Sequence, residues 1–284
     1  MAVDGLPTRL WHYTDQRGFL GMIESGTLWA SKVQYQNDQK EYRLTAELAA
    51  SIIKRRLDGR RSDNPVSDFL ESLSEHIEGR LEVNVCTASL TAKGDLLSQW
   101  RGYCRPGDGL SLGFDAEEIE GIAGSLGWSL ERCLYNRDEQ LEVVERLIDE
   151  GVRWLTSAPR HREPPGAAPG PIQAGARDFA LRIMAHAPTM KHQSFAEESE
   201  WRLISPPQDF RTLCYRPGRH TIVPYKAFPL RQEPLDALAT VEVKIGPTAH
   251  PLLAQSAAGG VLMAAEPKIP AYNVTVTETS YRDW

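Results

Sequence analysis

The last third of the chain constrains the fold most, because short strand-type runs follow one another there. Each run is rich in β-branched or aromatic residues and is bounded by turn residues, as strands commonly are. The runs are RTLCYRP (211–217), HTIVPY (220–225), LATVEVKIG (238–246) and YNVTVTE (272–278). Because the Pro-Gly turn within YRPGRHTI joins the first two runs directly, we expect a hairpin there.

Helices and strands follow each other less regularly in the first two thirds. Capping residues and apolar spacing predict the helices, and β-rich runs predict the strands. We expect helices at 16–24, 41–58, 67–79, 139–156, about 174–187 and about 248–258, and strands at 10–15, 27–31, 83–90, 110–114 and 195–204. This order lacks the strict strand–helix–strand alternation of parallel sheets. The predicted fold class is therefore α+β, with a mainly antiparallel sheet and surrounding helices.

One stretch rich in proline, glycine and alanine interrupts this pattern, SAPRHREPPGAAPGPIQAG at residues 157–175. Proline removes backbone donors and glycine adds chain entropy, so a packed element is not expected there. We interpret the stretch as a mobile loop or insertion within a single domain that spans residues 1–284.

The composition argues against several classes of protein. A formal net charge of −6 disfavours non-specific attraction to nucleic acid. The four cysteines lie far apart without a C-x-x-C motif, and no apolar run is long enough to cross a membrane. The seven histidines form no H-x-x-x-H or H-E-x-x-H pattern, so we expect no metal. These features predict a cytoplasmic protein without a membrane partner.

Three acidic residues stand together in FAEESEWRL, at residues 195–203. On a strand, Glu198 and Glu200 point to the same face, where two carboxylates repel each other unless a cation or a function holds them there. Either the two form a catalytic pair, or they face solvent or pair with Arg202 and other cations. Both interpretations stay open at this point.

Two further stretches contain candidate binding residues. LWHYTD, at 10–15, turns polar after the aromatic residues, which places His12 near the end of a strand. A histidine between aromatic residues is otherwise a core residue with satisfied hydrogen bonds. In QWRGY, Trp100, Arg101 and Tyr103 fall within about one helical turn, and aromatic residues beside arginine can stack on a planar ligand. Tryptophan at this spacing is also common in protein cores.

A basic run, IIKRRLDGRR, closes the helix expected at 41–58. Cations near a helix C-terminus are favoured by the helix dipole, so the run can be an ordinary solvated face. The alternative is a contact with nucleic acid, or guidance of a charged substrate to a site elsewhere. The candidate nucleic-acid-binding residues are Lys54, Arg55, Arg56, Arg60 and Arg61.

Several stretches taken together resemble the DUF2971 family of uncharacterised bacterial proteins. They are LWHYTD with GFLGMIESGTLWAS, YQNDQKE, SLTAKGDLLSQWRGYC with GLSLGFD, SFAEESEWRL, and VEVKIGP with a final SYR. The opening L-x-H-Y-T followed by L-x-x-I-x-x-G-x-L is also similar to the first strand and helix of ADP-ribosyltransferase-like (DarT-like) folds. This second resemblance is distant and covers mainly residues 10–31 and 195–204.

The second resemblance implies an ADP-ribosyltransferase-like split sheet and chemistry on NAD. By position, His12 would hold a ribose of NAD, Glu200 would be the catalytic glutamate, and Glu198 would be its partner in an E-x-E motif. Trp100 or Tyr103 would supply the aromatic residue near the nicotinamide. NAD is then consumed as a substrate, and no metal takes part. The candidate cofactor-binding residues are His12, Tyr13, Thr14, Trp100, Arg101 and Tyr103.

The function implied is that of an NAD-dependent ADP-ribosyltransferase-like enzyme. Breaking the bond between nicotinamide and ribose passes through an oxocarbenium-like transition state, which a nearby carboxylate stabilises. The acceptor is nucleic acid, protein or water, and a role as a toxin or antiphage defence effector follows by analogy. Two alternatives belong to other classes. One is a nucleotide-binding sensor or interaction module without turnover, using Trp11, Trp100 and Arg101, and the other is a metal-free nuclease using His12 with a carboxylate.

Overall fold

The computed structural model describes most of the chain. The described residues are 5–35, 39–58, 64–79, 84–104, 107–157, 170–218, 220–232, 238, 240–266, 269 and 273–279. Contacts divide the chain into two compact units, each described by itself. A sheet unit comprises Met1–Lys32, Cys86–Arg132 and Ala196–Trp284, and a helical unit comprises Val33–Val85 and Cys133–Phe195. The single domain expected over residues 1–284 stays a prediction.

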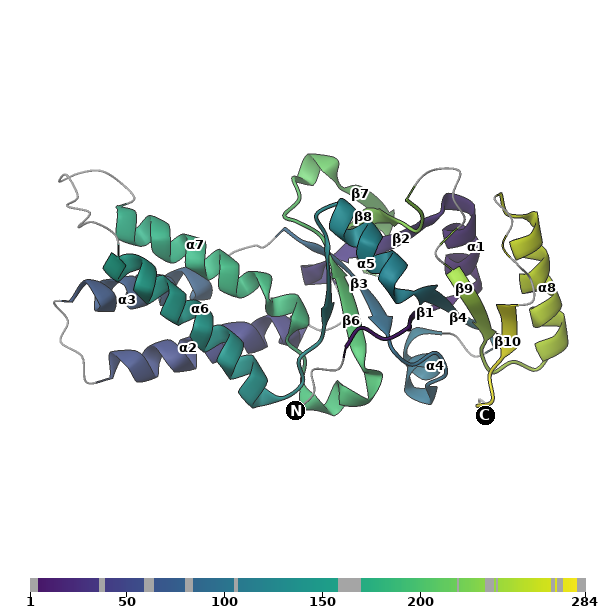
Figure 1. Ribbon diagram of the computed structural model, residues 1–284, viewed down its shortest axis with the longest axis horizontal. Coiled ribbons are helices and arrows are strands. Elements are labelled where there is room, and N and C mark those ends of the chain that lie inside the picture. Colours follow the sequence, from purple (N-terminus) through teal and green to yellow (C-terminus); the bar gives the residue numbers. More distant parts are fainter. Residues whose placement is uncertain are drawn as a thin grey trace. The chain divides into compact units, whose positions relative to one another are not determined.

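The described part of the sheet unit is built on a ten-stranded, mostly antiparallel sheet (Figure 1). Its strands are β1 (Arg9–Asp15), β2 (Thr27–Lys32), β3 (Cys86–Thr91), β4 (Gly109–Asp115), β5 (Ser129–Arg132), β6 (Glu200–Ile204), β7 (Cys214–Pro217), β8 (Ile222–Pro229), β9 (Thr240–Ile245) and β10 (Val274–Val276). One path runs β10-β9-β4-β1-β3-β2-β8-β7, while β6 pairs with β3 and β5. Only β9 and β10 pair in parallel among the described strands. The mainly antiparallel sheet and the hairpin of β7 and β8 are thus confirmed.

Local capping sets the bounds of the first helix in the sheet unit. The helices of this unit are α1 (Gln16–Ser25), α4 (Leu97–Tyr103), α5 (Ala116–Ser125) and α8 (Pro251–Ala264), with a 3-10 segment η4 (Phe210–Thr212). The Asp15 carboxylate accepts the Gly18 N–H at 2.8 Å, and Gly26 ends α1 at φ 63°. An aspartate cap satisfies a free donor of the first turn, and glycine takes the left-handed conformation without a Cβ clash. Across the described residues, no helix is long and apolar enough to cross a bilayer.

The helical unit consists of four long helices packed side by side (Figure 1). They are α2 (Gln39–Leu57), α3 (Pro65–Glu78), α6 (Arg137–Ser157) and α7 (Pro171–Ala185), with 3-10 segments η1 (Val33–Tyr35) and η2 (Ala187–Thr189). Of the loop predicted at 157–175, residues 158–169 lie outside the described residues. The prediction was wrong at its C-terminal end, where Pro171 begins α7. Proline suits the first helical position, because its fixed φ matches the helix and its missing N–H is not needed there.

Strand β1 carries aromatic side chains that face α4 on one side of the sheet. Trp11 and Tyr13 are two positions apart, so they share a face, and both pack with the buried Trp100 of α4. The Tyr13 and Trp100 rings meet edge to face with centroids 4.6 Å apart. A Cβ at Gly94 would come within 2.3 Å of the Trp11 ring, so this close approach requires glycine. The opposite face of the sheet packs against α1 and α5 in the main core.

Asp95 ties the start of α4 to the C-terminal segment of the sheet unit. Its carboxylate accepts the Trp100 indole N–H at 2.8 Å and the Glu278 N–H at 3.1 Å. It also accepts the hydroxyls of Thr277 and Thr279 at 2.5 and 3.2 Å. Burial raises the pKa of Asp95, but the hydrogen bonds to its charged form outweigh burial, and its pKa lies below the ordinary value. The carboxylate thereby fixes α4 on the sheet.

We expect the Asp95→Asn variant to lose about 2 kcal/mol of unfolding free energy at pH 7, because several donors lose a charged acceptor. The pKa of Asp95 is lower in the folded state. Its stabilisation is therefore present above the unfolded-state pKa of about 3.9 and disappears as the pH falls through the folded-state pKa. Urea denaturation of both proteins at neutral and acidic pH measures the difference. A difference that does not shrink in acid contradicts this role of the charge.

Candidate functional site

Strand β3 has a continuous strand partner on one edge only. On that edge, residues 87–91 pair with β6. On the other edge, β2 pairs with Cys86 and Thr87, and β1 pairs with Thr91 alone. Within the described registers, residues 88–90 therefore face no strand on this edge. The two strands that flank β3 here, β1 and β2, leave an opening beside its middle.

His12 of β1 occupies this opening and satisfies the backbone of β3. Its Nδ1 lies 2.9 Å from the carbonyl oxygen of Ser89, which would otherwise lack a strand partner. A carbonyl only accepts, so Nδ1 carries the proton, and Nε2 of the neutral ring is left as an acceptor. Burial lowers the pKa of His12 below its ordinary value of 6.5, and the hydrogen bond to Ser89 opposes this only in part. His12 is therefore neutral at pH 7.

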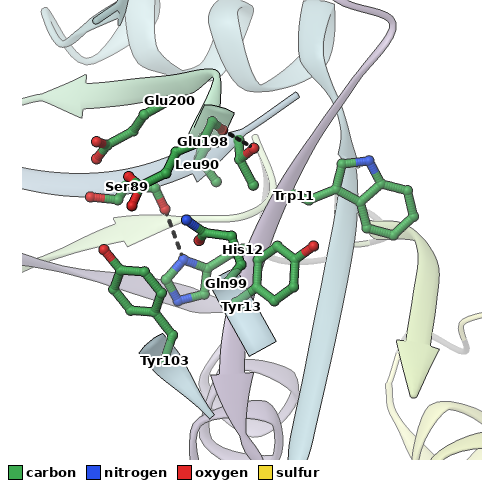
Figure 2. A pocket seen from close by; sticks show the side chains of 10 residues that line it. Trp11, His12, Tyr13, Ser89, Leu90, Gln99, Tyr103, Glu198 and Glu200 are labelled. Atoms are coloured by element: carbon green, nitrogen blue, oxygen red, sulfur yellow. Dashed lines mark hydrogen bonds between the residues drawn. The ribbon is translucent and has the colours of Figure 1, made fainter. Parts of the chain in front are cut away.

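A small cavity of about 30 Å³ adjoins His12 (Figure 2). Its walls come from β1, β3, α4, the end of the 3-10 segment η3 (Gln193–Glu198) and the first residue of β6. The lining residues are Trp11, His12, Tyr13, Ser89, Leu90, Thr91, Gln99, Tyr103, Glu198 and Glu200. The cavity thus brings together six residues that the sequence singled out, from segments far apart in the chain: Trp11, His12, Tyr13, Tyr103, Glu198 and Glu200.

Glu200 lies at the start of β6 and is 3% exposed. Its carboxylate forms a two-pronged ion pair with Arg202, with Nε–Oε1 and Nη2–Oε2 distances of 2.8 and 3.2 Å. The two residues are two apart on a strand and so share a face. The ion pair with Arg202 that the sequence left open is therefore present. It keeps a carboxylate charged beside the cavity and fixes its orientation.

Glu198 does not lie on a strand with Glu200, so the predicted strand at 195–204 was wrong in its first part. Ser199 between them has φ 45°, a left-handed conformation that breaks the alternation of a strand. Contacts to the end of β3 hold this turn, since the Thr91 hydroxyl donates to the Glu198 carbonyl and the Ala92 N–H donates to the Ser199 carbonyl. Both carboxylates still reach the cavity, but by different backbone routes.

The aromatic residues predicted to bind a cofactor divide into two groups. Tyr103 lines the cavity and is 45% exposed, which places it where the cavity meets solvent. Trp100 does not line the cavity, because its ring is buried behind Tyr13 and its indole N–H is held by Asp95. The Tyr13 hydroxyl donates to the Lys93 carbonyl at 2.9 Å, and burial raises the pKa of this hydroxyl. Trp100 and Tyr13 therefore support the wall of the cavity.

Two other predicted cofactor-binding residues lie outside the cavity lining. Arg101 is exposed on α4. Thr14 offers its carbonyl to the Cys104 thiol, with a sulfur–oxygen distance of 3.4 Å. A role for either residue in binding a ligand stays a prediction.

Several lining residues were not singled out from the sequence. Ser89 and Thr91 alternate along β3, and Gln99 precedes Tyr103 by four positions on α4. Polar residues at strand spacing, and a glutamine one helical turn from a tyrosine, share a face with their neighbours. This spacing is visible in the sequence, but which faces meet depends on how α4 packs on the sheet.

The basic run lies in the helical unit, away from the cavity residues in sequence. Arg55 forms an ion pair with Glu145, and Arg56 forms one with Asp149 at 2.6 Å, both on α6. These pairs give both arginines a structural role within the unit. Arg60 and Arg61 lie outside the described residues, and the contact of this run, including Lys54, with nucleic acid stays a prediction.

The donors and acceptors around the cavity suit an uncharged or cationic ligand with hydroxyl groups. They comprise a neutral imidazole acceptor at His12, the carboxylates of Glu198 and Glu200, and the amide of Gln99. Among the residues that the structure describes, no group of three or more His, Cys, Asp or Glu is placed to hold a metal ion.

Residues 99–203 match the family of proteins of unknown function called DUF2971. The resemblance to DUF2971 inferred from the sequence is confirmed over this segment. The segment begins at Gln99 and extends into β6, so it includes the α4 and acidic walls of the cavity but not His12. No curated protein matches the chain.

The hydrogen bond to Ser89 predicts the tautomer of His12. Long-range ¹H–¹⁵N NMR spectra should show a protonated Nδ1 and an unprotonated Nε2 at pH 6.5. This is expected because burial lowers the pKa of His12 and the Ser89 carbonyl only accepts. The other tautomer, or a doubly protonated ring at this pH, contradicts the geometry of the opening beside β3.

The buried ion pair predicts a stability effect that is not additive. Arg202→Met leaves a buried carboxylate unpaired and should cost about 3–5 kcal/mol of unfolding free energy. Adding Glu200→Leu should recover part of this loss, because the unpaired charge is then gone. Arg17→Met, at an exposed position of α1, is the control and should change little. Denaturant unfolding of the wild type, the two single variants Arg202→Met and Glu200→Leu, the double variant and the control measures the coupling, and simple additivity would argue against the pair.

Proposed function

We propose that the protein is an NAD-dependent ADP-ribosyltransferase-like enzyme. The observation that carries this proposal is the meeting of His12, Glu198 and Glu200 around one cavity. These are the residues to which the resemblance assigned the ribose-holding and catalytic roles. NAD is consumed as a substrate, and the reaction needs no metal because the nicotinamide leaves from a cationic pyridinium.

The opening beside β3 supports an ADP-ribosyltransferase-like split of the sheet. Trp11 and Thr91 form the one described β1–β3 pair, whereas β1 pairs with β4 over seven residues. Strand β1 therefore continues with β4 past the point where it leaves β3. A ligand that enters between the two strands would reach His12 and the acidic residues together.

The chemistry follows from the charges at the cavity. As the bond from ribose to nicotinamide breaks, positive charge develops on the ribose, and the Glu200 carboxylate stabilises it. Arg202 occupies one side of each carboxylate oxygen, and a carboxylate has about four acceptor sites, so a ribose hydroxyl can still bind. Nε2 of His12 accepts a second ribose hydroxyl. Glu198 orients or deprotonates the acceptor as a general base.

The acceptor is proposed to be nucleic acid or protein, with water as the default. Such an enzyme would suit a toxin or antiphage defence effector, a proposal made by analogy with enzymes of this chemistry. Tyr103 lines the cavity and is 45% exposed, which supports a proposed role for it as the aromatic residue beside the nicotinamide ring.

The ion pair also favours a second candidate, a nucleotide-binding module without turnover. Both oxygens of Glu200 are engaged by Arg202. A carboxylate held in this way is well suited to shaping a site, even where it takes no part in a reaction. The two candidates differ in what Glu200→Gln does, because a binding module should keep its affinity for NAD.

The test is the release of nicotinamide from NAD by the purified protein. Glu200→Gln should lower the rate by about 10²–10⁴-fold, because it removes the charge that stabilises the transition state. Glu197→Gln, an exposed neighbour outside the cavity lining, is the matched control and should keep the wild-type rate. Thermal unfolding checks that each variant is folded.

The outcome separates the two candidates when NAD binding is measured alongside. Release that depends on Glu200 supports the transferase. Binding without release, unchanged in Glu200→Gln, supports the binding module instead. An absence of both binding and release would rule out the proposal that NAD is the substrate.

A further inference from the structure

Gln99 is a buried polar residue whose side chain has no partner in the described structure. It lies in the first turn of α4, is 6% exposed and lines the cavity. Its backbone N–H is satisfied by the Leu96 carbonyl at 3.0 Å, but its side-chain amide makes no hydrogen bond to any described residue. The two polar atoms of this amide retain some exposed area, so a water molecule or a ligand in the cavity can complete their hydrogen bonds.

Unlike Gln99, the neighbouring side chains of Tyr13 and Thr91 have hydrogen-bond partners. Tyr13, on the same side of the sheet, both donates to the Lys93 carbonyl and accepts the Leu96 N–H, at 2.9 and 2.8 Å. The Thr91 hydroxyl donates to the Glu198 carbonyl and accepts the Lys93 N–H. The polar atoms without a partner at the cavity therefore include the Gln99 amide, the Ser89 hydroxyl and Nε2 of His12.

The size of the cavity limits what can enter it. A water molecule needs roughly 10–15 Å³ of such space. The cavity offers about 30 Å³, which suits a group of two or three non-hydrogen atoms. A whole nucleoside does not fit, so one small group of the ligand would fill the cavity, and the ring and ribose joined to it would lie at the rim, beside His12, Glu200 and the 45% exposed Tyr103. Figure 2 shows Gln99, His12 and Tyr103 around this space.

We infer that Gln99 recognises a primary carboxamide in the ligand by a reciprocal pair of hydrogen bonds. A glutamine amide presents one N–H and one carbonyl side by side, and a primary carboxamide presents the complementary pair. Such a group has three non-hydrogen atoms and matches the size of the cavity. The inference rests on the proposed function, since the nicotinamide of NAD is the part of the substrate that bears a carboxamide.

The charges around Gln99 also favour a carboxamide over a carboxylate in the ligand. A carboxylate in place of the carboxamide has no N–H for the Gln99 carbonyl. It would also place a negative charge near Glu198 and Glu200, which line the same cavity. A site built to bond a donor rejects a ligand that lacks it more strongly than an apolar pocket rejects an extra methylene. The cavity should therefore distinguish nicotinamide from nicotinic acid.

The test compares nicotinamide and nicotinic acid as probes with the full-length protein, by calorimetry and by ligand-observed NMR. The wild type should prefer nicotinamide by on the order of 100-fold. Gln99→Leu, of similar shape but without the amide, should lose this preference. Gln16→Leu, at an exposed position of α1, is the matched control and should keep it.

A second readout guards against misfolding of the variant. Replacing an unsatisfied amide by an apolar side chain should leave the thermal midpoint without ligand unchanged or raise it. Added nicotinamide should raise the midpoint of the wild type and of Gln16→Leu but not that of Gln99→Leu. A wild type that binds both probes equally, binds neither, or keeps its preference in Gln99→Leu overturns the inference.

These outcomes are separable from those of the proposed function. Nicotinamide binding that depends on Gln99, in a protein that does not cleave NAD, supports the inference while the transferase proposal fails. Cleavage of NAD by a protein whose discrimination is untouched by Gln99→Leu supports the transferase proposal while the inference fails.

Discussion

The hydrogen bonding of β3 is the constraint on which the candidate site depends. One edge of this strand is filled by β6, and the other is shared between β2 and β1 at its two ends. A buried backbone carbonyl cannot be left without a partner at little cost. The imidazole of His12 supplies that partner to Ser89 and stands where a strand would otherwise lie. The same contact that completes the sheet therefore fixes the orientation of an imidazole that lines the cavity.

The acidic side of the cavity is held by a different kind of interaction. Glu200 is buried with Arg202, so its charge is retained without exposure to water. Glu198 reaches the same space from a turn whose Ser199 takes a left-handed conformation at φ 45°. Such a conformation costs roughly 1–3 kcal/mol and persists only where the surroundings enforce it. Here the end of β3 enforces the conformation of Ser199, because the Thr91 hydroxyl donates a hydrogen bond to the carbonyl of Glu198.

Features fixed by neighbouring residues could be predicted from the sequence, and features fixed by tertiary contacts could not. Asp15 and Gly26 set the two ends of α1 through local hydrogen bonds and a local conformation, and a helix at 16–24 was predicted from such local signals. The backbone at Glu198 depends on a hydrogen bond from β3, which is far away in the sequence. The alternating pattern of a strand therefore predicted the wrong conformation for this residue. Trp100 is of a residue type that can stack on a ligand, but its indole N–H donates to the Asp95 carboxylate, and its ring is buried in the wall of the cavity. Residue type alone does not distinguish these two uses of a tryptophan.

The contrast between satisfied and unsatisfied polar groups explains why the cavity is better suited to a ligand than to a structural role. Around it, Asp95 accepts four hydrogen bonds and Tyr13 makes two. At the cavity, the amide of Gln99 makes no hydrogen bond within the described structure. In the proposed binding role, a ligand in the cavity would complete the hydrogen bonds of this amide. The wall of the cavity is rigid because its polar groups already have hydrogen-bond partners. A ligand that bonds to the few remaining donors and acceptors can therefore bind without reorganising the protein, and little of the binding energy is lost to rearrangement.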